Sequence, residues 1–185
     1  MQRRGCSSCK YFVILIVVLW PLVSPRAISG TREGCEQPPY DAFDFWVGDW
    51  RVLAPDGEVA GRNRISSQER GCLVLERWRG SSGGTGTSMS YYDPYADKWR
   101  RLWVSPGVQI DINGGLVDGS MVLSGVITYL VERERYPFRG TWTPLDDGRV
   151  RQYFEESRAP GVWRPWFEGF YVRAQQPTDQ ASGDP

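Results

Sequence analysis

The apolar positions of this chain form short runs separated by turn-forming residues, and no window holds a helical apolar period over ten or more residues. Runs of this kind, rich in aromatic and β-branched residues and bounded by Gly, Pro and Asp, are typical of strands. The sequence predicts strands over residues 46–54, 59–68, 72–79, 87–92, 98–105, 109–113, 121–134 (one bent strand or two), 139–144, 149–156 and 163–173.

The connections between these strands are short and carry strong turn signals. Asp147-Gly148 is a hairpin signal, and 81–86 is a Gly- and Ser-rich loop. Charges of alternating sign at 132–135 favour a solvated or edge strand. Regularly spaced short strands form a sandwich or an up-and-down barrel, and short hairpins favour the barrel. We therefore predict an all-β, antiparallel up-and-down barrel of about 8–10 strands.

The N-terminal thirty residues have the layout of a secretory signal peptide. A basic start precedes an apolar run at 11–23, and Ala27-Ile28-Ser29 offers a cleavage site. We expect a signal peptide at 1–29, a polar lead-in at 30–39, the barrel at 40–174 and a disordered tail at 175–185. The protein is thus predicted to be exported, to a periplasm or the medium. The alternative is a membrane anchor formed by an uncleaved leader.

Composition and charge exclude several classes of function. Without the leader the chain keeps 18 basic and 22 acidic side chains, and a mildly acidic domain binds nucleic acid poorly. The chain has no histidine, which excludes His-based triads, His-ligated zinc and a proximal-His haem. We expect no metal and no cofactor. Cys35 and Cys72 remain after cleavage, and they are expected to form a disulfide or, alternatively, to be two separate buried thiols.

Three segments, taken in order, resemble a known group of proteins. They are FDFWVGDW at 43–50, GCLVLERW at 71–78 and RGTWTP at 139–144, accompanied by YDP at 92–94 and KW at 98–99. Together they resemble a broad group of uncharacterised bacterial proteins with an FDFWxGxW signature, which is lipocalin-like or calycin-like. The resemblance covers about residues 35–173. The resemblance implies a β-barrel and does not imply any particular activity.

Within this resemblance, Gly48-Asp49-Trp50 is similar to the G-x-W motif on the first strand of lipocalins. In lipocalins that Trp closes one end of the barrel and packs against a basic residue of the last strand. The resemblance therefore implies that Arg173 is the partner of Trp50. Trp46, Gly48, Trp50 and Arg173 are accordingly predicted to be structural residues rather than ligand contacts.

Candidate chemistry follows from polar residues on apolar strand faces, because alternate residues of a strand share a face. Glu76 shares its face with Val74 and Trp78. A buried carboxylate needs a partner, so this position fits a salt bridge or a general acid. Gln152 and Glu156 are the polar members of another apolar face. Arg101 and Arg139 are candidate partners for these two, or for an anionic head group. The candidate ligand contacts are Glu76, Tyr91, Arg101, Trp103, Arg139, Gln152 and Glu156.

Three functions are compatible with this pattern. The leading hypothesis is an exported protein that binds a small apolar or amphipathic ligand in its barrel, gripped by aromatic walls. The second is a barrel enzyme that uses buried carboxylates, such as an isomerase, hydratase or hydrolase; no catalytic residue is assigned. The third is a structural or protein-interaction domain with a filled barrel. The expected partner is a small molecule, with no nucleic acid and no stable membrane insertion after cleavage. The sequence carries no signal for an oligomeric state.

Overall fold

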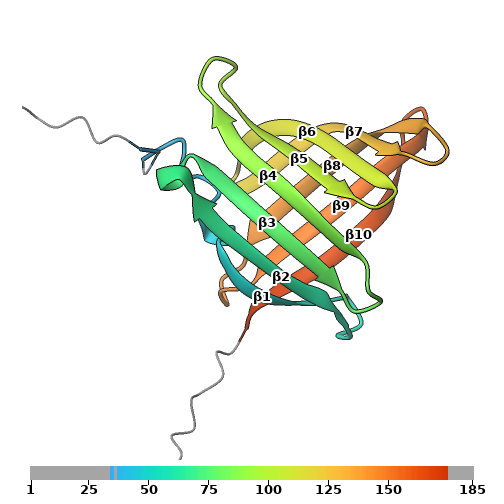
Figure 1. The fold of residues 1–185 in the computed structure, drawn as a ribbon, viewed down its shortest axis with the longest axis horizontal. Coiled ribbons are helices and arrows are strands. Elements are labelled where there is room, and N and C mark those ends of the chain that lie inside the picture. Colours follow the sequence, from blue (N-terminus) through green and yellow to red (C-terminus); the bar gives the residue numbers. More distant parts are fainter. Residues whose placement is uncertain (1–33, 36, 175–185) are drawn as a thin grey trace, which may run out of the picture. The chain divides into compact units, whose positions relative to one another are not determined.

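Ten antiparallel strands follow one another around a closed barrel, in which the first strand pairs with the last (Figure 1). The computed structural model describes residues 34–35 and 37–174. The leader and tail predicted at 1–29 and 175–185 lie outside the described residues, as do 30–33 and 36 of the lead-in. The predicted all-β up-and-down barrel is confirmed, with the strand number at the upper end of the expected range.

Within the described residues, two short 3₁₀ helices, η1 and η2, accompany the strands. The elements in chain order are η1 (Asp44–Trp46), β1 (Gly48–Leu53), β2 (Val59–Gln68), η2 (Glu69–Gly71), β3 (Leu73–Gly80), β4 (Thr85–Asp93), β5 (Lys98–Ser105), β6 (Val108–Val117), β7 (Ser120–Tyr129), β8 (Glu134–Pro144), β9 (Val150–Ala159) and β10 (Val162–Arg173).

Several predicted strand boundaries are wrong for identifiable reasons. The glycines at 114–115 do not end β6, because the backbone of the neighbouring strand packs against Gly114 and extends the ladder. The segment 132–135 forms the end of the β7–β8 turn and the start of β8, and no edge strand is present among the described residues. The structure divides the segment predicted at 121–134 among β7, this turn and the first residue of β8. Trp46 belongs to η1 rather than to the first strand.

One end of the barrel is closed by the segment that precedes β1. Phe43 and Trp46 are fully buried there, with their rings stacked 5.0 Å apart. Trp50 pairs with Arg173 across the β1–β10 seam, and the guanidinium lies 3.9 Å from the Trp50 ring centroid. The pair implied by the G-x-W resemblance is therefore in contact. Gly48 is required beside it, because its φ is +148° and a Cβ would meet Arg173 Nη1 at 1.8 Å.

A disulfide holds the lead-in against the barrel. Cys35 and Cys72 are bonded, with their Cα atoms 4.7 Å apart, which confirms the predicted pair. Cys72 follows η2 between β2 and β3, so the bond fixes the start of the described chain to the same end of the barrel that η1 closes. Within residues 34–35 and 37–174, no helix has the length and apolar character needed to cross a membrane.

Candidate functional site

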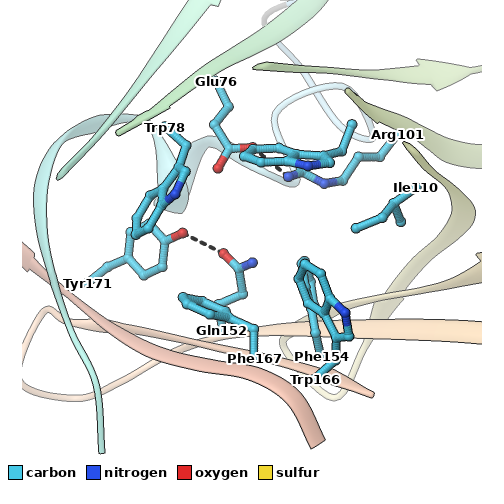
Figure 2. Close-up of a pocket in the computed structure, with 10 residues that line it drawn as sticks. Glu76, Trp78, Arg101, Ile110, Gln152, Phe154, Trp166, Phe167 and Tyr171 are labelled. Carbon is cyan, nitrogen blue, oxygen red and sulfur yellow. Dashed lines mark hydrogen bonds and ion pairs between the residues drawn. The ribbon is translucent and has the colours of Figure 1, made fainter. Parts of the chain in front are cut away.

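The barrel interior holds a cavity of about 130 Å³, whose lining residues Figure 2 shows. It lies toward the end away from η1, because Trp78 and Trp103 are near the ends of β3 and β5 opposite to η1. Its walls are mainly aromatic, and its base is polar. A wider depression of about 400 Å³ lies beyond it, between the β3–β4 and β5–β6 connections. The inner cavity is lined by Glu76, Trp78, Arg101, Trp103, Ile110, Gln152, Phe154, Trp166, Phe167 and Tyr171. Trp78, Trp103 and Trp166 line both spaces, so these three rings form the neck between cavity and mouth.

A buried ion pair forms one side of the polar base. Glu76 on β3 and Arg101 on β5 are both 2% exposed, and Arg101 Nη2 lies 2.5 Å from Glu76 Oε2. The carboxylate also accepts hydrogen bonds from Ser88 Oγ at 2.7 Å and from Asn63 Nδ2 at 2.5 Å. Three donors stabilise the ionised carboxylate, which is how a buried charge becomes tolerable. Glu76 is thus in a salt bridge, one of the two roles that the sequence left open.

The Arg101 guanidinium is enclosed by aromatic rings as well as by the carboxylate. It lies 5.0 Å from the ring centroids of both Trp46 and Trp142, within the range of a cation–π contact. Its Nη1 donates to Ser88 Oγ at 2.6 Å. These contacts place the positive charge between the plug at the closed end and the base of the cavity, and they hold the side chain in one position.

The other side of the base is a chain of neutral hydrogen bonds. Tyr171 on β10 donates to Gln152 Oε1 at 2.6 Å, and Trp142 Nε1 donates to the same oxygen at 3.1 Å. Asn63 Nδ2 donates to Tyr171 Oη at 3.1 Å, which joins this chain to the carboxylate of Glu76. Burial, reinforced by the negative charge of Glu76, raises the pKa of Tyr171 well above its ordinary value. Tyr171 is therefore a neutral donor at physiological pH.

Glycines make room for the aromatic walls. A Cβ on Gly86 would lie 2.0 Å from an atom of the Trp103 ring, and one on Gly140 would lie 2.4 Å from Phe154. Gly61 has the same relation to Trp78, at 2.7 Å. Each ring thus lies against bare backbone on a neighbouring strand and covers it, as aromatic side chains do over glycines in sheets. Because the rings lie along the wall, the space at the centre stays open.

A polar cluster holds Trp166 at the neck. Its indole Nε1 donates to Tyr129 Oη at 3.1 Å, and Tyr129 donates to Glu156 Oε2 at 2.7 Å. Arg158 pairs with the other oxygen of Glu156 and lies 4.9 Å from the Tyr129 ring centroid. Burial, followed by the hydrogen bond to Glu156, raises the pKa of Tyr129. This cluster fixes the ring that separates the cavity from its mouth.

The structure brings together four of the seven predicted ligand contacts. Glu76, Arg101, Trp103 and Gln152 line one cavity, although Arg101 pairs with Glu76 and not with Gln152. The other three do not line it, for different reasons.

Tyr91 and Arg139 require correction, because both are on the outer face of the barrel. Tyr91 is 44% exposed, since it follows the inward-facing Ser90. Arg139 pairs with Glu155 at 2.6 Å and stacks on Trp163. Glu156 belongs to the polar cluster around Tyr129 and does not line the cavity.

Sequence reasoning missed several members of the site. Asn63 and Tyr171 complete the base, and Trp78, Phe154, Trp166 and Phe167 supply most of the wall. Alternation contained a signal for Asn63, which lies two residues from the buried Ile65 and so shares its inward face. Trp166 had no such signal, because β10 changes register against β9 between Pro165 and Phe167.

Comparison with known proteins adds no assignment. No protein-family model matches the chain, and no curated protein matches it at a significant level. Among the described residues, no group of three or more Cys, Asp or Glu side chains is placed to hold a metal ion. The function is therefore inferred from the geometry of the cavity.

Proposed function

We propose that this protein is an exported, lipocalin-like binding protein that holds a small apolar or amphipathic ligand in its barrel. The observation that carries the proposal is the cavity of about 130 Å³, with aromatic walls, a polar base and a mouth at one end of the barrel. A cavity of roughly 150 Å³ is enough to bind benzene. The inner space thus fits one ring or the end of a chain, and the rest of an amphipathic ligand extends through the mouth.

Two features support the cellular part of this proposal. The Cys35–Cys72 disulfide is the kind of bond that persists in an oxidising compartment. The basic start and apolar run of the leader fit secretion. We further propose that the chain belongs to the lipocalin-like group with the FDFWxGxW signature, since the corresponding segment supplies the plug at the closed end of the barrel.

The two competing functions receive less support. In an enzyme that uses buried carboxylates, one carboxylate should be available to a substrate. Glu76 is held by Asn63, Ser88 and Arg101, and Glu156 by Tyr129 and Arg158. A filled barrel would leave no space for a ligand, whereas this interior keeps a cavity next to a free mouth.

Titration of intrinsic Trp fluorescence with decanol and ethylbenzene tests the proposal, with native mass spectrometry to count the bound molecules. Quenching is expected because three Trp residues form the neck. Ile110→Phe places a larger side chain in the cavity and should abolish the response. Leu102→Phe on the outer face of β5 is the matched control and should leave it intact. The proposal is overturned if neither ligand binds, or if both variants respond like the wild-type protein.

A further inference from the structure

The Gln152 amide has one orientation that satisfies its surroundings. Its Oε1 accepts hydrogen bonds from two N–H or O–H donors, Tyr171 and Trp142. A flipped amide would place its NH₂ group against the Trp142 N–H, where no acceptor is available. The oxygen is therefore fixed toward β10 and β8. Figure 2 shows the amide nitrogen turned away from Tyr171, toward the space in front of Ile110.

This nitrogen is a donor without a protein partner. Within the described chain Gln152 Nε2 makes no hydrogen bond, although the residue is only 4% exposed. The indole N–H of Trp78, another wall residue, also makes none among the described residues. Both polar groups can only donate. A buried donor gains most from a ligand that brings an acceptor, because its own solvation is poor.

The cavity offers no uncompensated charge. Glu76 and Arg101 neutralise each other, and both are engaged by the surrounding hydroxyl and amide groups. An anion would face the Glu76 carboxylate, and a cation would face Arg101, each without a counter-charge of its own. Because a buried charge without a partner is strongly disfavoured, the base discriminates against ionised ligands.

The shape of the space selects flat groups. Trp78, Trp103 and Phe154 lie along the wall over glycine backbone, and Trp166 and Phe167 complete the enclosure. Planar faces at these positions favour offset or edge-to-face packing with another ring. A volume of about 130 Å³ holds a single ring and not a fused ring system.

From these features we infer that the cavity selects an uncharged single-ring aromatic group that carries a hydrogen-bond acceptor, such as a ketone or amide carbonyl. The acceptor lies at Gln152 Nε2, and the ring lies between the aromatic walls. This inference rests on the proposed binding function and adds the chemical class of the ligand to it. The selectivity comes from the base of the cavity, whereas the neck admits the molecule.

Nuclear magnetic resonance of the ¹⁵N-labelled wild-type protein tests the hydrogen bond directly. Acetophenone has a ring and a carbonyl acceptor, and ethylbenzene has nearly the same shape without the acceptor. Acetophenone should move the side-chain amide signal of Gln152 downfield, and ethylbenzene should not. Benzoate and benzylammonium should bind at least about tenfold more weakly than acetophenone, because their charges stay unpaired.

A pair of Gln→Met variants gives a second readout. Gln152→Met removes the donor, and Gln109→Met makes the same exchange on the exposed face of β6. The affinity of acetophenone relative to that of ethylbenzene should fall about fivefold in the first variant and stay constant in the second. Comparing this affinity ratio between the proteins cancels the effect of the different water solubilities of the two probes. If Gln152→Met does not fold, the wild-type amide signal still decides the question.

The outcomes separate this inference from the proposed function. If decanol or ethylbenzene quenches the Trp fluorescence but acetophenone leaves the Gln152 amide signal unmoved, the ligand class is wrong and the binding function stands. Benzoate binding as tightly as acetophenone also overturns the ligand class. If no probe, decanol included, binds at all, both proposals fail together.

Discussion

The Glu76 carboxylate and the Arg101 guanidinium lie in the barrel interior, where each replaces part of the water that the other has lost. Removing one member of such a pair is costly, because the other charge stays buried without its partner. Surface pairs behave differently, since water screens and solvates both groups. The barrel has both kinds: Arg64 and Asp49 lie 2.7 Å apart on the outside, with side chains 70% and 60% exposed.

Arg101→Met should therefore lower the free energy of unfolding by about 3–5 kcal/mol, because Glu76 is left without a counter-charge. Arg64→Met makes the same chemical change at the surface pair and should alter the stability little. Chemical denaturation of both variants, compared with the wild-type protein, measures the difference. Equal losses in the two variants would show that the interior pair has no special role.

Ionisation of Tyr171 should make the stability of the folded protein depend on pH in the alkaline range. Burial raises its pKa well above the ordinary 10.0 in the folded protein, so the unfolded chain releases this proton first as the pH rises. Its contribution is complete below pH 10.0 and is lost as the pH rises toward the folded-state pKa. Denaturation at several pH values should show the advantage of wild type over Tyr171→Phe shrinking above about pH 10. A difference that stays constant up to about pH 11.5 would contradict this account.

Single residues also show how far sequence reasoning reaches. Alternation placed Glu76 on the same face as Val74 and Trp78 and required a partner if that face looked inward; the structure has Glu76 buried and paired with Arg101. Tyr91 and Arg139 were chosen by residue type, although their neighbours Ser90 and Gly140 are the ones that face inward. On β4 hydrophobicity misleads about which residues face the interior, because Ser88 and Ser90 are buried while Met89 and Tyr91 are exposed. On β8 the apolar Phe138 and Trp142 share the inner face with Gly140, so alternation along that strand already indicated that Arg139 faces outward.

At the scale of elements, turn chemistry and the runs of aromatic and β-branched residues located most strands. The bounds of β2 and β5 agree with the sequence prediction at both ends. Glycines caused the errors in β6, because Gly114 serves close packing against the β7 backbone rather than a turn. The 3₁₀ helix η1 was also missed, and Trp46 was placed on the first strand, since its aromatic residues fit a strand equally well by composition. The local preference of aromatic residues for strands does not distinguish a strand of the barrel wall from a segment that fills the end of the barrel.

The disulfide is an element-level constraint, because it ties the lead-in to the segment between β2 and β3. It closes a loop between cysteines 37 residues apart. The chain-entropy model gives such a crosslink about 4 kcal/mol of stabilisation, through the unfolded state. A reducing agent should lower the Tm of the wild-type protein, and the double variant Cys35→Ser/Cys72→Ser should have the lower Tm with or without it. An unchanged Tm on reduction would assign the bond no stabilising role.

At the scale of the whole molecule, the barrel is asymmetric along its axis. The η1 segment fills one end with Phe43 and Trp46, and the buried polar network lies next to it. The other end keeps a cavity because its aromatic rings lie flat on glycine backbone. Sequence reasoning reached the closed barrel and, through the G-x-W resemblance, one end closed by a Trp residue. It did not reach the packing of the open half, which depends on contacts such as Gly86 with Trp103 that join neighbouring strands.

If flat rings keep the cavity open, a methyl group under one of them should close it. A Cβ on Gly86 would lie 2.0 Å from the Trp103 ring, so in Gly86→Ala the ring has to move away from the wall and into the cavity. Overpacking of this kind costs about 1–3 kcal/mol of stability, and the lost space should weaken ethylbenzene binding by about tenfold.

Gly84→Ala, two residues earlier, adds the same methyl group where no atom lies within 4 Å. It should leave both stability and binding near wild type. Fluorescence titration and chemical denaturation of the two variants test this directly: if Gly86→Ala folds with undiminished ethylbenzene affinity, the ligand does not occupy the space beside Trp103.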